Sequence, residues 1–330
     1  MKAQARLAAA QKEATTGRYS DVGVSLGFKT GQTVSMRNEH ARLGAILDAN
    51  AVAKTRLSST QSILKGLVED AQTFIGALIG ARSSDTGAQV VAAEARARLT
   101  SLVNGINTAI DGAHIFAGIN TEFAPLFDYF ADPPGQSRQS VANAFFAAFG
   151  MPQSDPAVAG ISAADMQAFL DGPFDALTEE PAWSGNWSNA SDQNITSRIS
   201  PSEVIETSIS ANAGAIRKLI SAYVMVADLG AEQLNEGAFQ VIVDTGVRTA
   251  GLAIQELTTL RATLGIAEER IAAAEKRMSF QMDILAKHVT NLEAVDPYEA
   301  SLRVTSLLTQ IEMAYALTAR LQEMSLVYRL

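Results

Sequence analysis

The chain has 330 residues and a formal net charge of −9, and 47% of its residues are hydrophobic although only 6% are aromatic. This acidic balance leaves no basic stripe that could displace counterions from phosphate, which argues against a nucleic-acid partner. The sequence has no cysteine and no apolar run near the roughly 18 residues of a membrane span, which excludes disulfides, thiol catalysis and membrane insertion.

The first residues favour a helix with one apolar face, formed by Ala3, Leu7, Ala10 and Ala14. Gly17, in the turn TTGRYSD, is expected to end it. Because no capping residue precedes this helix, we expect it to be the remnant of a longer one. The segment also lacks the continuous apolar core of a secretory signal, so an exported protein would use another route.

A second helix is predicted over residues 43–78 from a heptad pattern typical of a coiled coil. Nine of its eleven heptad positions are apolar. These positions are Leu43, Ile46, Asn50, Ala53, Leu57, Thr60, Leu64, Leu67, Ala71, Phe74 and Leu78. A third helix is predicted over about 87–112, leading into HIFAGINTEFAPL.

The composition then changes. Eight of the nine prolines lie between Pro125 and Pro201, nine of the thirteen phenylalanines lie between Phe116 and Phe174, and both tryptophans fall in the same region. We therefore predict a separate insert domain over residues 121–200 that is dispensable for the fold of the rod. SVANAFFAAFG and SAADMQAFLDGPFDAL favour short helices, and the alternation from residue 195 to residue 206 favours a two-stranded ribbon.

Long helices resume from about residue 211. Six of seven heptad positions over 264–295 are apolar. These positions are Ile271, Glu275, Met278, Met282, Leu285, Val289 and Leu292. Asp296 is placed as an N-cap, Pro297 suits the first helical position and Glu299 suits a capping box, so the last helix is predicted to run from Pro297 to the end of the chain.

These elements predict a mainly α fold, with a long antiparallel helical rod and a small α+β insert. Its parts are N-terminal rod helices over 1–120, the projecting insert over 121–200 and C-terminal rod helices over 201–330. Helix 43–78 is expected to pack antiparallel against 264–295. The last helix has an apolar stripe at the very end of the chain, where chain ends usually fray unless something binds them. We predict an assembly interface at Leu307, Ile311, Tyr315, Leu321, Leu326 and Tyr328.

Few motifs indicate chemistry. GVSLG, residues 23–27, matches the G-x-S-x-G nucleophile elbow, but it follows a polar turn instead of a buried strand, so we interpret it as a glycine-rich loop. His40, His114 and His288 lie far apart without metal-ligand spacing. We therefore predict no catalytic site, no metal and no cofactor.

One surface candidate remains in the insert. Trp183 and Trp187, with Asn186 between them, could form an aromatic platform on which sugar rings stack. The alternative is that both tryptophans fill the small core of the insert. A ligand-binding role requires at least one of them to be exposed.

Segments near both ends resemble the bacterial flagellin superfamily. QKEATTGRYSD resembles its N-terminal helix and S/T-T-G-K/R turn, HIFAGINTEFAPL resembles its F-x-G-x-x-T segment, and residues 291–330 resemble its C-terminal helix. The ending MSLVYRL is closer to the L-S-L-x-x-x-L ending of the hook-filament junction proteins than to that of filament flagellins. The family has a further helical stretch before the part matched by MKAQARL.

The resemblance implies a structural subunit, secreted through the flagellar export apparatus with a chaperone. It would assemble at the cell surface, in the flagellum, with like subunits and other axial proteins through its terminal helices. Two functions stay open: a flagellar building block, as junction protein or filament subunit, and a surface protein whose insert binds a polysaccharide or a host surface.

Overall fold

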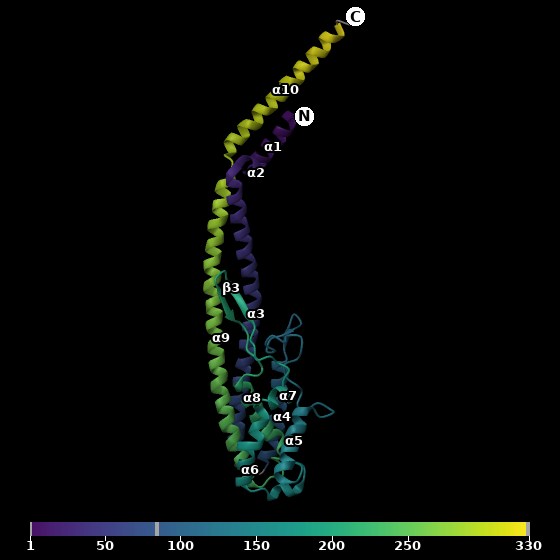
Figure 1. Ribbon diagram of the computed structural model, residues 1–330, viewed down its shortest axis with the longest axis vertical. Helices are drawn as coiled ribbons and strands as arrows, with labels where there is room; N and C mark the ends of the chain where they lie inside the picture. Colours follow the sequence, from purple (N-terminus) through teal and green to yellow (C-terminus); the bar gives the residue numbers. More distant parts are fainter. Residues whose placement is uncertain (1, 83–85, 328–330) are drawn as a thin grey trace. The chain divides into compact units, whose positions relative to one another are not determined.

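The structure, a computed structural model, describes residues 2–82 and 86–327, and side chains as far as residue 322. Most of the chain is helical and the strands are short, which confirms the predicted mainly α class (Figure 1). The helices are α1 (Lys2–Thr16), α2 (Val22–Leu26), α3 (Thr30–Ala81), α4 (Gly87–Ile106), α5 (Gln136–Phe149), α6 (Ala163–Phe169), α7 (Ala182–Asn186), α8 (Gly214–Asp228), α9 (Glu236–Glu293) and α10 (Pro297–Val327).

In the described residues, four strands and several short helical turns complete the fold. The strands form two antiparallel pairs, β1 with β2 and β3 with β4. Their bounds are Ala109–Ile110 for β1, Ala113–His114 for β2, Thr196–Ser200 for β3 and Glu203–Glu206 for β4. The turns are η1 (Gly27–Lys29), η2 (Pro156–Gly160), η3 (Leu170–Phe174) and η4 (Asp175–Thr178).

Contacts divide the chain into two compact units. The first joins Met1–Leu47 with Glu275–Leu330, and the second is Asp48–Ala274. The first unit therefore holds both terminal helices, α1 and α10, together with the beginning of α3 and the end of α9. These are the purple and yellow ends of the colour scale in Figure 1.

The long helices α3 and α9 run antiparallel, as predicted. In the second unit, Gln61 Nε2 donates to the Arg261 carbonyl at 2.8 Å and Arg82 pairs with Asp244 at 2.9 Å. The partner segment differs from the predicted 264–295. Helix α9 already begins at Glu236 and its Gly246 lies against Leu78, so the part of α9 beside residues 43–78 begins before residue 264.

The predicted heptad positions of α3 form its buried side. Ten of the eleven are buried and Ile46 is half-buried. The two polar positions have partners: Asn50 Nδ2 donates to the Ile199 carbonyl of β3 at 3.1 Å, and Thr60 Oγ1 donates to the Arg56 carbonyl at 2.9 Å. These hydrogen bonds replace part of those made with water, and only Asn50 Oδ1 of the two side chains has no hydrogen-bond partner among the described residues.

The third helix is shorter than the predicted 87–112. It ends at Ile106, and a tight hairpin of β1 and β2 follows. Asp111 and Gly112, at the tip of this hairpin, both have positive φ, 51° and 79°. An Asp-Gly pair favours this type of turn, so the sequence signal for the hairpin was present at the dipeptide.

The middle of the chain shares its core with the helices of the second unit. The short helices α5 and α6 and the β3–β4 ribbon, all predicted, are present. Tyr129 Oη donates to Asp228 of α8 at 2.9 Å, and Trp183 Nε1 donates to Asn212 at 2.7 Å. One continuous cluster of buried side chains includes α3, α4, α8, α9 and residues 126–187. The boundaries at residues 120 and 200 remain a prediction, but these contacts argue against a dispensable insert.

Candidate assembly surface

The last helix begins where its capping residues place it. The Asp296 carboxylate accepts from the Tyr298 N–H at 2.8 Å, the Asp296 carbonyl accepts from the Ala300 N–H at 2.9 Å, and Pro297 occupies the first helical position. Asp296 is thus the N-cap that the sequence predicted. The Glu299 carboxylate accepts from Arg303 Nη2 at 2.9 Å, an i,i+4 pair.

The turn after α1 is joined to the turn before α10 by backbone hydrogen bonds. Gly17, at φ +67°, ends α1 as predicted, and its carbonyl accepts from the Val295 N–H at 3.0 Å. The Tyr19 N–H donates to the Glu293 carbonyl at 3.0 Å. Helix α1 therefore ends, and α10 begins, at one hydrogen-bonded joint of the first unit.

Two buried carboxylates lie at this joint. Glu293 is fully buried, with one oxygen 2.5 Å from Arg37 Nη2 and 3.8 Å from Arg18 Nη1. Glu13 is also buried, and it accepts from Ser20 and pairs with Arg303 of α10 at 3.2 Å. A buried charge needs such partners, because without them its transfer from water is very unfavourable.

One side of α10 packs against α1. In α1, Leu7 and Ala14 are half-buried and Ala10 is buried, so three of the four residues of the predicted face are covered. At the far end of the pair, Gln4 Nε2 donates to the Tyr315 hydroxyl at 2.9 Å. The residues of α10 that are covered share one face, at spacings of three and four. They are Ala300, Val304, Leu307 and Ile311.

The opposite side of α10 is uncovered. Residues nine apart lie about two and a half turns apart and so point in opposite directions. Leu302 is opposite Ile311, Tyr298 is opposite Leu307, and Met313 is opposite Val304. Four apolar side chains on this side have exposed fractions above one half. They are Tyr298 (77%), Leu302 (60%), Met313 (55%) and Leu317 (61%), and we call them the open face of α10.

The predicted interface residues are therefore placed in different environments. Leu307 and Ile311 lie on the side covered by α1, whereas Tyr315 and Leu321 are exposed. Leu326 belongs to α10 but its side chain is outside the described part, and Tyr328 is outside the described residues. The sequence predicts one continuous interface, but the structure divides it. Residue spacing identifies the apolar positions of a helix, whereas only the packing shows which of them a neighbouring helix already covers.

The tryptophan platform does not form on the surface. Trp183 and Trp187 are buried and stack on each other with ring centroids 5.8 Å apart, and Trp187 stacks on Tyr129 at 5.5 Å. Asn186, between them, is half-buried. The exposure that a sugar-binding platform requires is absent at both rings, and the three aromatic rings instead fill the core.

The GVSLG motif and the histidines also lie in surroundings that indicate structural roles. GVSLG is not the glycine-rich loop that we expected. It lies mainly in helix α2, capped by the Asp21 carboxylate, which accepts from the Val24 N–H at 3.0 Å, and no strand precedes its serine in the described part of the chain. His114 Nδ1 lies 2.8 Å from the Asn107 carbonyl, and His288 is exposed on α9. Within residues 2–82 and 86–327, no group of three or more histidine or acidic side chains is arranged to hold a metal.

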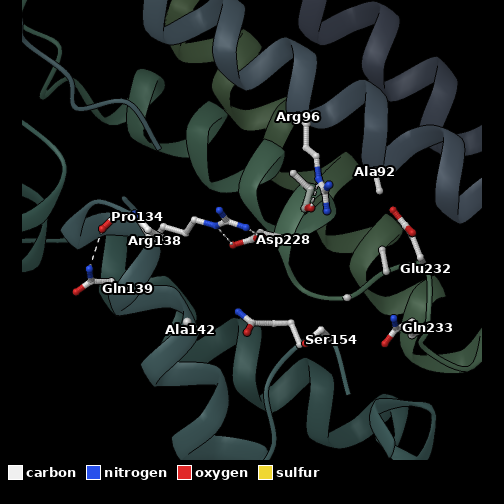
Figure 2. A pocket seen from close by; sticks show the side chains of 14 residues that line it. Ala92, Arg96, Pro134, Arg138, Gln139, Ala142, Ser154, Asp228, Glu232 and Gln233 are labelled. Carbon is white, nitrogen blue, oxygen red and sulfur yellow. Dashed lines mark hydrogen bonds and ion pairs between the residues drawn. The ribbon is translucent and has the colours of Figure 1, made fainter. Parts of the chain in front are cut away.

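A pocket of about 490 Å³ opens beside the C-terminal end of α8, and Figure 2 shows its lining. Arg96 Nε donates to the Ala227 carbonyl at 3.0 Å, and Arg138 points toward Asp228, with Nη2 at 3.3 Å from its carboxylate. Both guanidinium groups thus neutralise the negative end of α8. Burial, together with the Asp228 charge and hydrogen bond, raises the pKa of Tyr129 well above its usual value.

The described helices include none that is long and apolar enough to cross a membrane. Two long antiparallel helices, and a terminal helix with an apolar face that the described residues leave exposed, are typical of a structural protein that associates with other proteins.

Comparison with known proteins identifies the family. Residues 1–121 match the bacterial flagellin N-terminal helical region, and residues 247–330 match the bacterial flagellin C-terminal helical region. Together these matches cover more than half of the chain, which belongs to the bacterial flagellin family and is a structural subunit of the flagellum. The resemblance drawn from the sequence is confirmed.

Two solved structures have a similar fold. One is a Vibrio parahaemolyticus protein described as a flagellar hook-associated protein, with a TM-score of 0.54, 10% identity and coverage of 80% of this chain and 97% of that one. The other is FlgL of Bacillus cereus, with a TM-score of 0.52, 12% identity and coverage of 78% and 99%. No curated protein has a sequence similar enough to count as a match.

Proposed function

We propose that the chain is secreted through the flagellar export apparatus, with a chaperone, and assembles at the cell surface with like subunits and other axial proteins. Membership of the flagellin family supports this proposal. Its role is architectural: the subunit contributes contacts to the axis of the flagellum and catalyses no reaction. Among positions in the flagellum, we favour the junction between hook and filament, because the fold is shared with a protein described as hook-associated.

The open face of α10 is the observation on which the assembly proposal rests. Tyr298, Leu302, Met313 and Leu317 lie on one side of a helix whose other side is already occupied by α1. Such a face exposes apolar area to water in the free subunit and would be covered by a neighbouring subunit.

The size of this face predicts how it associates. Burying four such side chains contributes roughly 6–12 kcal/mol if each contributes about 1.5–3 kcal/mol. Association of two bodies costs an estimated 4–15 kcal/mol in lost freedom of motion. A contact between two subunits through this face alone is therefore weak. An array in which each subunit touches several neighbours would be stable, because the later contacts form at a high effective concentration.

Electron microscopy and sedimentation of the concentrated full-length protein, with and without flagellar fragments as seeds, test the proposal. We expect assemblies from the wild-type chain. The double variant Leu302→Asp/Leu317→Asp should stay monomeric while keeping its helical circular dichroism, because charges on the open face oppose its burial.

The matched control is Ala319→Asp, an exposed position on α10 that belongs neither to the open face nor to the side covered by α1. It should assemble as the wild type does. A wild-type chain that remains monomeric in both conditions would contradict the proposed assembly, and a double variant that still assembles would exclude the open face as its basis.

A further inference from the structure

A second exposed apolar feature lies in the first unit, in the segment that joins α1 to α3. Val24 of α2 and Phe28 of η1 are 82% and 92% exposed and four residues apart. We call this pair the knob. Exposed apolar side chains are common singly, but an aromatic ring held almost wholly in water, four residues from a second exposed apolar side chain, indicates a contact surface.

The knob is held by defined local structure. The Asp21 carboxylate caps α2 through the Val24 N–H, and Thr30 Oγ1 donates to the Gly23 carbonyl at 3.2 Å. Gly27, between the two knob residues, has φ +54°, a conformation that glycine adopts without strain and that turns the chain from α2 into η1. The sequence thus builds a fixed projection here.

The same unit contains a depression that suits an aromatic side chain. It has about 200 Å³ of free space and an apolar floor that includes Leu285 and Val289 of α9. Arg18, Arg37 and His40 also line it. The Glu293 carboxylate holds both guanidinium groups in place, so the lining is preorganised. Cationic groups around an apolar floor favour the face of an aromatic ring.

We propose that the knob of one copy of the chain occupies this depression on a second copy. Phe28 does not fill the depression of its own chain, since 92% of its surface is exposed. A knob and a pocket on different parts of one chain give a heterologous contact, which repeats from copy to copy and generates open helical arrays. The inference rests on the proposed assembly and adds a contact distinct from the open face of α10.

The chain has no cysteine, so single cysteines report proximity without background. A Phe28→Cys protein and an affinity-tagged Ala286→Cys protein, each wild type elsewhere, are mixed, assembled and oxidised. Ala286 lines the depression and is exposed. We expect a disulfide-linked pair of the two proteins well above the amount that random collision gives. The control replaces the first partner with Phe123→Cys, an exposed phenylalanine of the second unit, and should give only the random level.

A second measurement covers the case in which a cysteine disturbs the contact. Phe28→Ala should raise the concentration needed for assembly by at least tenfold, with an unchanged melting temperature because the ring contacts water in the free subunit. Phe123→Ala should assemble as the wild type does. If the wild-type chain assembles, equal assembly by Phe28→Ala together with cross-linking at the random level overturns the knob contact and leaves the proposed function standing. If the wild-type chain does not assemble, the proposed function itself has failed.

Discussion

At the scale of single residues, buried polar groups differ in whether they have partners. Tyr223 and Tyr129 are both buried, but Tyr129 Oη donates to Asp228 whereas the Tyr223 hydroxyl has no hydrogen-bond partner among the described residues. Tyr223 instead packs edge-on against Phe74, with ring centroids 5.0 Å apart. Substitution by phenylalanine therefore removes a hydrogen bond at one site and only an unsatisfied hydroxyl at the other.

We predict that Tyr223→Phe leaves stability at pH 7 unchanged or slightly higher, whereas Tyr129→Phe lowers it by about 1–3 kcal/mol because the partly buried Asp228 loses a donor. Thermal unfolding followed by circular dichroism measures both. Equal losses would contradict the difference in partners.

The burial of Tyr223 also predicts how the stability of the protein depends on pH. Burial raises the pKa of Tyr223 well above its ordinary value. Above about pH 10 the unfolded chain releases this proton while the folded chain keeps it, so the free energy of unfolding falls as pH rises. Tyr223→Phe should reduce this alkaline loss between about pH 10 and pH 12 and leave the range of pH 6–9 unaffected.

The joint between the terminal helices gives another residue-scale prediction. Arg37→Ala removes the nearer partner of the buried Glu293 carboxylate and should cost about 1–3 kcal/mol, since Arg18 stays within 3.8 Å. Arg42→Ala breaks only the exposed pair with Glu39 and should cost about 0–1 kcal/mol. Urea unfolding of the two variants gives the comparison, and an equal cost would show that burial of Glu293 is unimportant.

At the scale of elements, helices α3 and α10 use their apolar residues differently. Ten of the eleven heptad side chains of α3 are buried in the subunit, whereas the apolar side chains of α10 are partly covered by α1 and partly exposed, the latter including the open face. Helix α3 therefore contributes to the stability of the subunit, and α10 offers much of its apolar area to other molecules.

We predict that Leu57→Asp unfolds the second unit, because a charge replaces a fully buried side chain whose burial contributes about 1.5–3 kcal/mol. Leu285→Asp should cost less, because Leu285 is half-buried. Leu321→Asp should leave the melting curve almost unchanged and weaken assembly, because Leu321 is exposed. Similar melting losses at all three positions would contradict this division of roles.

At the scale of the whole molecule, residues 121–200 share a core with the helices of the second unit. Because their buried aromatic side chains pack in the same cluster as α8 and α9, removal of the segment exposes apolar surface on the helices that remain. These contacts argue against the sequence-based expectation that the rod folds without the insert, an expectation that a deletion protein can test.

We predict that replacing residues 121–200 with a short Gly/Ser linker lowers the melting temperature of the second unit or makes the protein insoluble. The shorter connection reduces loop entropy by little, roughly 0.6 kcal/mol per halving of length, which does not offset the lost apolar burial. Differential scanning calorimetry of the deletion protein tests this. An unchanged transition would restore the idea of an independent insert.

The sequence by itself determined the mainly α class, the buried side of α3, the start of α10 and the flagellin family. These features depend on local information, namely periodicity, capping residues and motifs. Only the tertiary structure decided that Trp183 and Trp187 form a core stack, that the insert shares its core with the helices, and that α1 covers Leu307 and Ile311 while Leu302 and Leu317 stay open. The reason is physical: an apolar residue favours burial wherever it occurs, and which partner buries it depends on segments distant in the sequence.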